Sequence, residues 1–116
     1  MDYQKNEQKA LCAKYSAEYF EVIPSLKVGI SLDRANGTYP INGLRHPPEG
    51  DTSGWYIWFG EHFSEDTEFF KPMHIAHLND YCPEIIKFLG LPPGWRFLTT
   101  PEYEDVWEDP NLLNLK

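Results

Sequence analysis

Alternating apolar and polar residues predict several strands in this chain. The segment LKVGISLD, residues 26–33, places Leu, Val, Ile and Leu on one side and Lys, Gly, Ser and Asp on the other. This period of two is typical of a half-buried strand. Gly29 lies on the polar side and indicates a bulge or the close approach of another group. Shorter segments at 95–99 and 103–107 predict two further strands near the C-terminal end.

The strand GWYIWFGE, residues 54–61, is apolar on both faces. Successive side chains of a strand point to opposite faces, so this segment presents two separate apolar sets. We expect it to be the central strand, with one set packed beneath helices. The set expected there comprises Trp55, Ile57 and Phe59. The other set, Tyr56 and Trp58, is left to be covered by a loop, by the C-terminal tail or by a partner.

Three segments have the pattern of helices. Residues 5–20 contain no Gly or Pro and carry one apolar stripe that includes Leu11, Tyr15 and Tyr19. Pro72 is followed by MHIAHLNDYC, and Pro83 begins PEIIKFLG; proline is favoured at the first position of a helix. Gly90 would end the second of these short helices.

The order of these elements indicates an α+β fold. Residues 34–53 are dense in turn-forming residues and predict one long loop with little secondary structure. We therefore expect a small, mostly antiparallel sheet of three to five strands, with an N-terminal helix and two short helices packed on it. The length of 116 residues favours a single domain over residues 1–116.

The charge of the chain is unevenly distributed. The formal net charge is -8, and residues 61–116 carry eleven acidic and only four basic residues. Proteins that bind nucleic acids present basic surfaces, so we expect no nucleic-acid partner. An acidic surface suits a basic protein partner, although the same charge is also explained by solubility.

The N-terminus and the two cysteines bear on localisation. No signal peptide pattern and no apolar run long enough to span a membrane is visible. We expect a cytoplasmic protein with no membrane partner. Cys12 and Cys82 lie far apart in sequence and are expected to be buried free thiols.

Candidate residues for chemistry are few. His74 and His77 share a helix face if the segment is helical, and with His62 they form a candidate zinc site. The spacing differs from that of a zinc-protease helix, whose histidines are four apart with a glutamate between them. We therefore expect these histidines to lie on a partly exposed helix face, with no bound metal or cofactor. Motifs for nucleophilic catalysis and for phosphate binding are absent from the sequence, so no catalytic residue is assigned.

The segment PEYEDVWEDP, residues 101–110, combines aromatic and acidic residues. Tyr and Trp are favoured anchors of protein interfaces, and surrounding acids suit a basic target. On a strand, Tyr103, Asp105 and Trp107 share one face. The ordinary alternative is a terminal strand whose aromatic residues pack inward and whose acids face water.

Five segments together resemble the Imm33-like family of bacterial proteins, formerly a domain of unknown function. They are LRHPPEG, SGWYIWFGE, FFKPMHIAHL, CPEIIKFLGLPPGWRF and YEDVW, and they span about residues 40–110. The family is a predicted immunity-protein family of polymorphic toxin systems. The resemblance implies a small cytoplasmic α+β protein that binds a toxin encoded nearby, with no established catalytic residues.

Two hypotheses of function follow. In the first, a non-enzymatic immunity-type protein neutralises a cognate, basic toxin through an acidic, aromatic surface. The residues expected there are Glu61, Glu65, Asp66, Glu68, Tyr103, Glu104, Asp105 and Trp107. In the second, a small molecule or peptide binds under the 34–53 loop against Tyr56 and Trp58. The sequence leaves the oligomeric state open.

Overall fold

The computed structural model describes residues 2–31, 39–60 and 70–113. Its strands are β1 (Lys27–Ile30), β2 (Ile41–Arg45), β3 (Thr52–Phe59), β4 (Lys71–His74), β5 (Trp95–Thr100) and β6 (Tyr103–Glu108). Its α-helices are α1 (Asp2–Lys14) and α2 (Leu78–Tyr81), and its 3₁₀ helices are η1 (Ile75–His77), η2 (Pro83–Phe88) and η3 (Pro110–Leu113).

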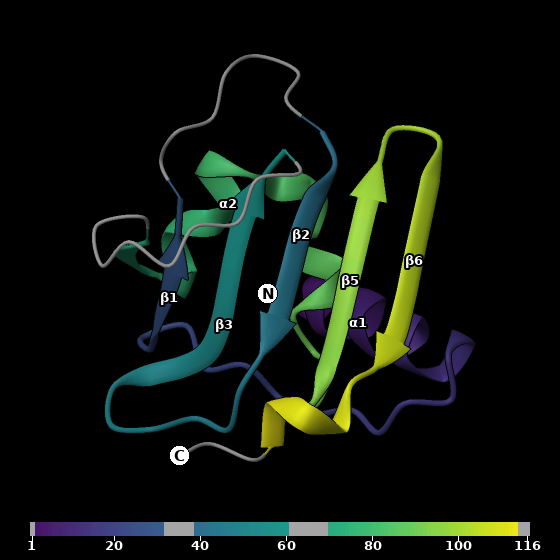
Figure 1. Cartoon of the computed structure of the whole chain (residues 1–116), viewed down its shortest axis with the longest axis horizontal. Coiled ribbons are helices and arrows are strands. Elements are labelled where there is room, and N and C mark those ends of the chain that lie inside the picture. Colours follow the sequence, from purple (N-terminus) through teal and green to yellow (C-terminus); the bar gives the residue numbers. More distant parts are fainter. Residues whose placement is uncertain (1, 32–38, 61–69, 114–116) are drawn as a thin grey trace.

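The strands form one six-stranded sheet in the order β4-β1-β3-β2-β5-β6. Helices α1 and α2 lie behind this sheet in Figure 1, so the view shows its open face. The pair β1–β3 is parallel and the other four pairs are antiparallel. The α+β class predicted from the sequence is confirmed, and the sheet is mixed, with six strands where three to five were expected.

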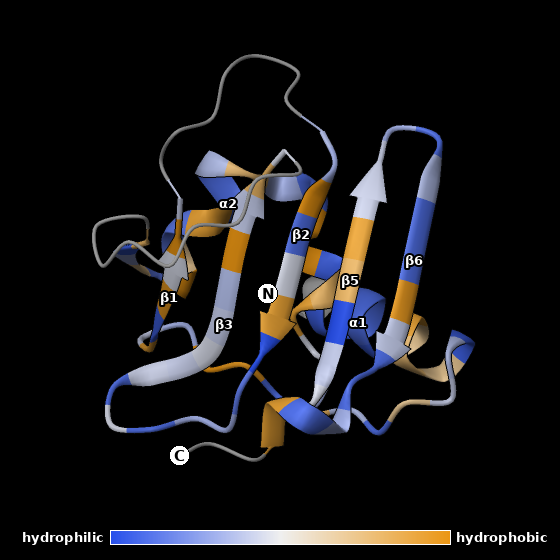
Figure 2. Cartoon of the chain, in the orientation of Figure 1, coloured by the Kyte–Doolittle hydropathy of each residue, from blue (hydrophilic) through white to orange (hydrophobic). Residues whose placement is uncertain are grey.

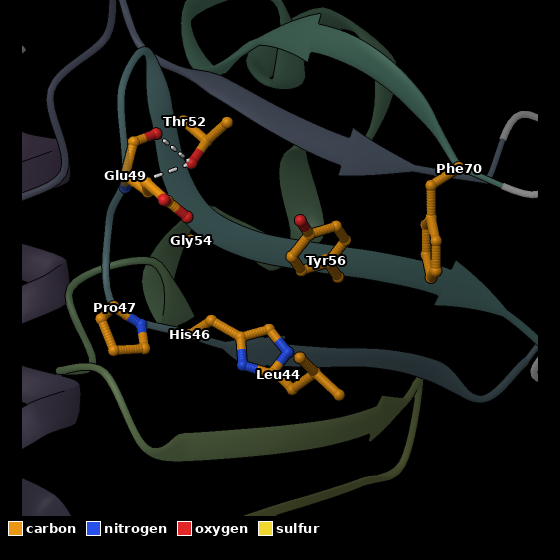
Figure 3. Close-up of a pocket in the computed structure, with 8 residues that line it drawn as sticks. All are labelled: Leu44, His46, Pro47, Glu49, Thr52, Gly54, Tyr56 and Phe70. Carbon is orange, nitrogen blue, oxygen red and sulfur yellow. Dashed lines mark hydrogen bonds between the residues drawn. The ribbon is translucent and has the colours of Figure 1, made fainter. Parts of the chain in front are cut away.

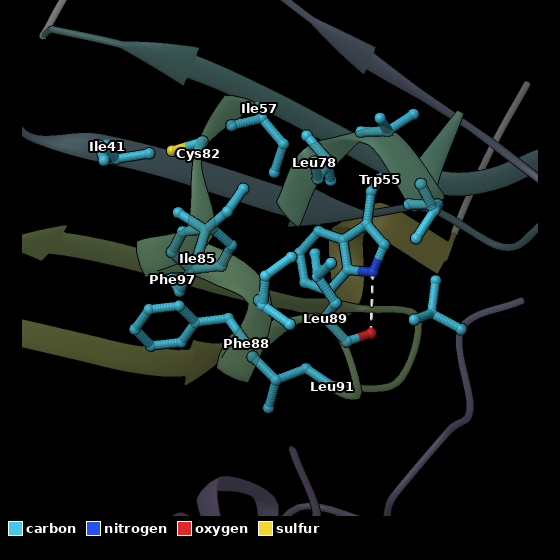
Figure 4. Close-up of a cluster of buried hydrophobic side chains, with 14 of the residues drawn as sticks. Ile41, Trp55, Ile57, Leu78, Cys82, Ile85, Phe88, Leu89, Leu91 and Phe97 are labelled. Atoms are coloured by element: carbon cyan, nitrogen blue, oxygen red, sulfur yellow. Dashed lines mark hydrogen bonds between the residues drawn. The ribbon is translucent and has the colours of Figure 1, made fainter. Parts of the chain in front are cut away.

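The strand β3 lies inside the sheet, as its apolar pattern predicted. Trp55, Ile57 and Phe59 are buried on the helix-covered face. The indole nitrogen of Trp55 donates a hydrogen bond to the carbonyl of Leu89 at 3.1 Å (Figure 4). This bond allows a large side chain with a polar atom to be fully buried without loss of a hydrogen bond.

The predicted 34–53 loop is wrong, because residues 41–45 form β2. Two of its inward positions are not apolar, which hid the strand pattern. Gly43 faces the core because a Cβ there would overlap the ring of Phe97. Arg45 also points inward and is only 1% exposed. Glycine therefore makes room for an aromatic ring, and the charged residue lies in the core.

The buried Arg45 is solvated by backbone carbonyls. Its Nε donates to the carbonyl of Ser53 at 3.0 Å, and its Nη1 lies 3.2, 3.3 and 2.8 Å from the carbonyls of Phe20, Leu89 and Leu91. Burial lowers the pKa of Arg45 from 12.5 to about 10, so the side chain stays charged at neutral pH. The guanidinium thus joins two segments outside the sheet, the chain at Phe20 and the stretch that contains Leu89 and Leu91, to β2 and β3.

The edge strand β4 replaces the beginning of a predicted helix. The pattern after Pro72 predicted a helix, but residues 71–74 pair with β1, and helix begins only at Ile75. Proline lacks the backbone N–H, which an edge strand can leave unpaired on its outer side. The second predicted helix is present as η2, beginning at Pro83.

The helix α1 is shorter than the predicted helix at 5–20. It ends at Lys14, and Ser16 adopts a positive φ of 59°. The N–H groups of Ser16 and Ala17 bond to the carbonyls of Ala13 and Cys12 at 3.2 and 2.8 Å, which is the Schellman pattern of a helix end. Tyr15 and Tyr19 therefore follow the helix instead of continuing its apolar stripe.

Candidate functional site

The open face of the sheet carries three of the residues expected to bind a partner, all of them on β6. In the antiparallel register Tyr103 lies opposite Thr100, Asp105 opposite Leu98 and Trp107 opposite Arg96. Residues that are directly opposite share a face, so the predicted common face of Tyr103, Asp105 and Trp107 is present. Figure 2 shows that β6 is the more polar strand at this end of the sheet, while β3, β2 and β5 are richer in apolar residues.

Two aromatic residues stand on this acidic strand in different environments. Tyr103 is 57% exposed. Trp107 is half-buried, and the guanidinium of Arg96 lies 5.5 Å from its ring centre in a cation–π contact. Arg96 also pairs with Asp109 at 3.3 Å. Tyr103 and the exposed Asp105 are therefore accessible, while the guanidinium of Arg96 already packs against the ring of Trp107.

Glu104 lies on the opposite face and is already paired. Its carboxylate accepts bonds from Tyr15 Oη at 2.6 Å, Lys87 Nζ at 2.9 Å and Lys14 Nζ at 3.1 Å. Desolvation alone would raise the pKa of Glu104, but these three hydrogen bonds outweigh it and lower the pKa from 4.5 to about 2. This carboxylate therefore fastens β6 to α1 and η2. The sequence does not distinguish it from the exposed acids beside it.

The other four acids expected on this surface fall outside the described residues. They are Glu61, Glu65, Asp66 and Glu68.

Tyr56 and Trp58, whose covering the sequence did not determine, have different surroundings. Trp58 is 5% exposed, whereas Tyr56 is half-buried and lines a pocket. Leu112 of η3 belongs to the same apolar cluster as Trp58, so the C-terminal segment contributes to this face. The ring of Phe70 stands edge-on to both rings, with centres 5.3 Å from Tyr56 and 6.4 Å from Trp58.

The pocket on this face has a volume of about 320 Å³. Figure 3 shows its lining residues: Leu44, His46, Pro47, Glu49, Thr52, Gly54, Tyr56 and Phe70. The ring of His46 meets Tyr56 edge-on, with centres 5.6 Å apart. Its Nδ1 lies 3.1 Å from the carbonyl of Leu112, which requires a proton on Nδ1 because a carbonyl only accepts.

Sequence reasoning assigned Tyr56 to a possible ligand site but missed most of its neighbours. Trp58 does not line this pocket, although it was expected to. The wall formed by 46–52 belongs to the segment interpreted as a loop, and Phe70 comes from a distant part of the chain. The segment HPPEG after β2 was the one sequence feature that indicated this wall, because its two prolines restrict the backbone there.

The histidine and cysteine candidates are placed as follows. His74 and His77 are exposed, with perpendicular rings 5.8 Å apart, and His62 falls outside the described residues. Within 2–31, 39–60 and 70–113, no three His, Cys, Asp or Glu side chains cluster as metal ligands do. Cys12 and Cys82 are buried free thiols, as predicted. Burial raises the pKa of the Cys12 thiol, against the lowering effect of Arg45, so the thiol stays protonated.

The family model for the Imm33-like domain matches residues 7–109. The chain belongs to the Imm33-like family. The match extends the resemblance seen at about 40–110 to the N-terminal helix, so nearly all elements of this Imm33-like protein are part of the family domain. No curated protein and no solved structure matches the chain. The described helices of the Imm33-like protein are all too short or too polar to cross a membrane.

Proposed function

We propose that this Imm33-like protein is a cytoplasmic, non-enzymatic immunity protein that binds and neutralises a cognate bacterial toxin. The family name supports a protein partner of this kind. Immunity proteins act by binding, so family membership favours a binding surface over a catalytic centre.

The observation that carries the proposal is the composition of the open face at β6. Tyr103 is exposed there, Asp105 lies beside it, and neither is engaged in an ion pair among the described residues. A basic toxin is attracted to such a surface, because complementary charge speeds encounter and aromatic side chains supply the buried anchor. A specific interface buries about 800 Å² on each partner, so neighbouring acids take part as well.

The contact set differs in one member from the set expected from sequence. Glu104 is excluded because its carboxylate is already bonded to Tyr15, Lys14 and Lys87. Glu61, Glu65, Asp66 and Glu68 are retained on the strength of their charge alone.

A pulldown with the product of the neighbouring gene tests the proposal. That product should be toxic on its own, bind this chain, and lose its toxicity when both are expressed together. If the product is neither toxic nor bound, the proposed function fails.

A pair of charge-reversal variants tests the surface. Asp105→Lys places a base beside Tyr103 and should weaken toxin binding at least tenfold, mainly through slower association at low salt. Asp80→Lys makes the same change on α2, on the helix side, where the residue is also exposed. It should leave binding within twofold. Equal effects of the two variants would show that net charge, and not this face, determines binding.

A second candidate function rests on the pocket that contains Tyr56. Its volume of about 320 Å³ is within the range of small-molecule sites, and it combines aromatic rings with His46, Glu49 and Thr52. Here the protein would bind a small ligand or a peptide side chain. An NMR titration with a panel of aromatic amines and carboxylates tests it: saturable shifts should appear at His46 and Thr52, and should be lost in Tyr56→Ala.

A further inference from the structure

The strand β6 ends the sheet and offers one free backbone edge. Within the part of the chain that the structure describes, β6 pairs with β5 on one side only. The two strands are joined through Pro101 and Glu102, and in a two-residue hairpin the flanking residues form a hydrogen-bonded pair. At the other end the N–H of Asp109 donates to the carbonyl of Gly94 at 2.6 Å. This bond fits the same alternation, in which every second residue of β6, counted from Tyr103, is hydrogen-bonded to β5.

This alternation determines which backbone groups of β6 point away from β5. Tyr103, Asp105 and Trp107 use their N–H and C=O groups toward β5. The N–H and C=O groups of Glu104, Val106 and Glu108 therefore point away from the sheet. Among the described residues these outward groups have no backbone hydrogen-bond partner outside the sheet.

The opposite edge of the sheet is protected in a way that β6 is not. The strand β4 has four residues and contains Pro72, which lacks an N–H donor. A short strand with a proline discourages the addition of another strand. The strand β6 has six residues without proline or a register shift, so its edge is long and regular.

The charges of β6 select the kind of strand that can add to it. Exposed acids at Asp105 and Glu108 and the adjacent Glu102 leave the edge negative, and β6 contains no basic residue. Two copies of this edge would bring like charges together, which disfavours self-pairing. The carboxylate of Glu104 pairs with both Lys14 and Lys87, so this group carries one excess positive charge, and the three acids at 102, 105 and 108 outweigh it at the edge.

We propose that the outer edge of β6 binds an extended, lysine- or arginine-rich segment of a protein partner as a seventh strand. Backbone hydrogen bonds to Glu104, Val106 and Glu108 provide affinity, and the acids beside them select a basic sequence. This mode deepens the proposed function, on which its biological role rests, by assigning the contact to the edge of the sheet as well as to its open face.

A defined peptide tests the edge independently of any toxin. The ¹⁵N-labelled full chain is titrated with an octapeptide of alternating lysine and valine, and amide shifts are followed by NMR. The amides of Glu104, Val106 and Glu108 should shift most, and in a saturable way, because they gain hydrogen bonds. A glutamate–valine octapeptide should cause no such shift. The lysine–valine peptide with every backbone nitrogen methylated keeps its charge but loses its donors, and it should bind at least tenfold more weakly.

A matched pair of variants separates the backbone donor from the charge. Glu108→Pro removes one outward N–H and should lower the affinity for the lysine–valine peptide about fivefold, which is the effect of losing one hydrogen bond. Glu108→Ala removes the charge but keeps the N–H, so the shift pattern should persist.

Three results would overturn the edge site: no saturable shift at millimolar peptide, equal binding of the methylated peptide, or shifts that are largest at the amides of Tyr103 and Trp107 and not at those of Glu104, Val106 and Glu108. Each leaves the toxin pulldown unaffected, so the edge site and the proposed function fail separately.

Discussion

Replacing Glu104 by glutamine is expected to destabilise the protein in a way that depends on pH. The side chain of Glu104 is 18% exposed and binds Tyr15, Lys14 and Lys87. The folded protein holds its pKa at about 2, against an ordinary value of 4.5. At about 1.36 kcal/mol for each pH unit, the ionised carboxylate contributes about 3 kcal/mol to the free energy of unfolding at pH 7.

The direction of the pH effect follows from the lowered pKa. The folded state binds a proton less readily than the unfolded state, so the full stabilisation is present above about pH 4.5. It is lost as the pH falls through the folded-state pKa of about 2. At pH 3 about 1.5 kcal/mol remains. Glutamine does not titrate, so the difference between the two proteins should shrink by about 2 kcal/mol between pH 7 and pH 3.

Urea denaturation at pH 7, 5, 4 and 3 measures this difference. The control is Glu108→Gln, which neutralises an exposed acid on the same strand and should change stability by less than about 0.5 kcal/mol. A constant difference between Glu104→Gln and the native protein from pH 7 to pH 3 would refute the assigned role of the carboxylate. So would a difference at pH 7 as small as that of the control.

Three further outcomes are expected. Gly43→Ala should lower the free energy of unfolding by about 2 kcal/mol, because the new Cβ overlaps the Phe97 ring, and thermal melting measures it. Arg45→Met should lower the free energy of unfolding, measured by urea denaturation, by about 3 kcal/mol, because it leaves buried carbonyls without a hydrogen-bond donor. Unchanged stability would mean that the cost of desolvating the guanidinium cancels the gain from its hydrogen bonds. Tyr103→Ala should leave stability within about 0.5 kcal/mol but weaken toxin binding at least tenfold, as measured by calorimetry; a loss of stability instead would indicate a structural role.

The parts of the fold that the sequence predicted are those with a strong local pattern. The strand β1 alternates between apolar and polar residues, β3 is apolar on both faces, and β5 and β6 are also present as predicted. The choice of Trp55, Ile57 and Phe59 as the buried set of β3 is confirmed. Gly29 is the site of both predicted features. The register shifts next to it, and a Cβ there would lie 2.7 Å from the ring of Tyr56.

The parts that were missed depend on contacts between distant segments. The strand β2 has Gly43 and Arg45 on its core side, which local patterning interprets as a loop. Glycine is explained only by the Phe97 ring across the sheet, and arginine only by carbonyls at 20, 53, 89 and 91. The residues after Pro72 form a strand because β1 offers an edge there, and pairing overrides the local preference for helix.

The candidate surface divides in the same way. The sequence by itself determined that Tyr103, Asp105 and Trp107 share a face, because the period of a strand is two whatever it packs against. Only the tertiary structure decided that Glu104 is bound by two lysines and a tyrosine from other segments, while Asp105 next to it stays exposed. Adjacent carboxylates look alike in a sequence, and their difference arises from which cations the fold brings within hydrogen-bonding distance.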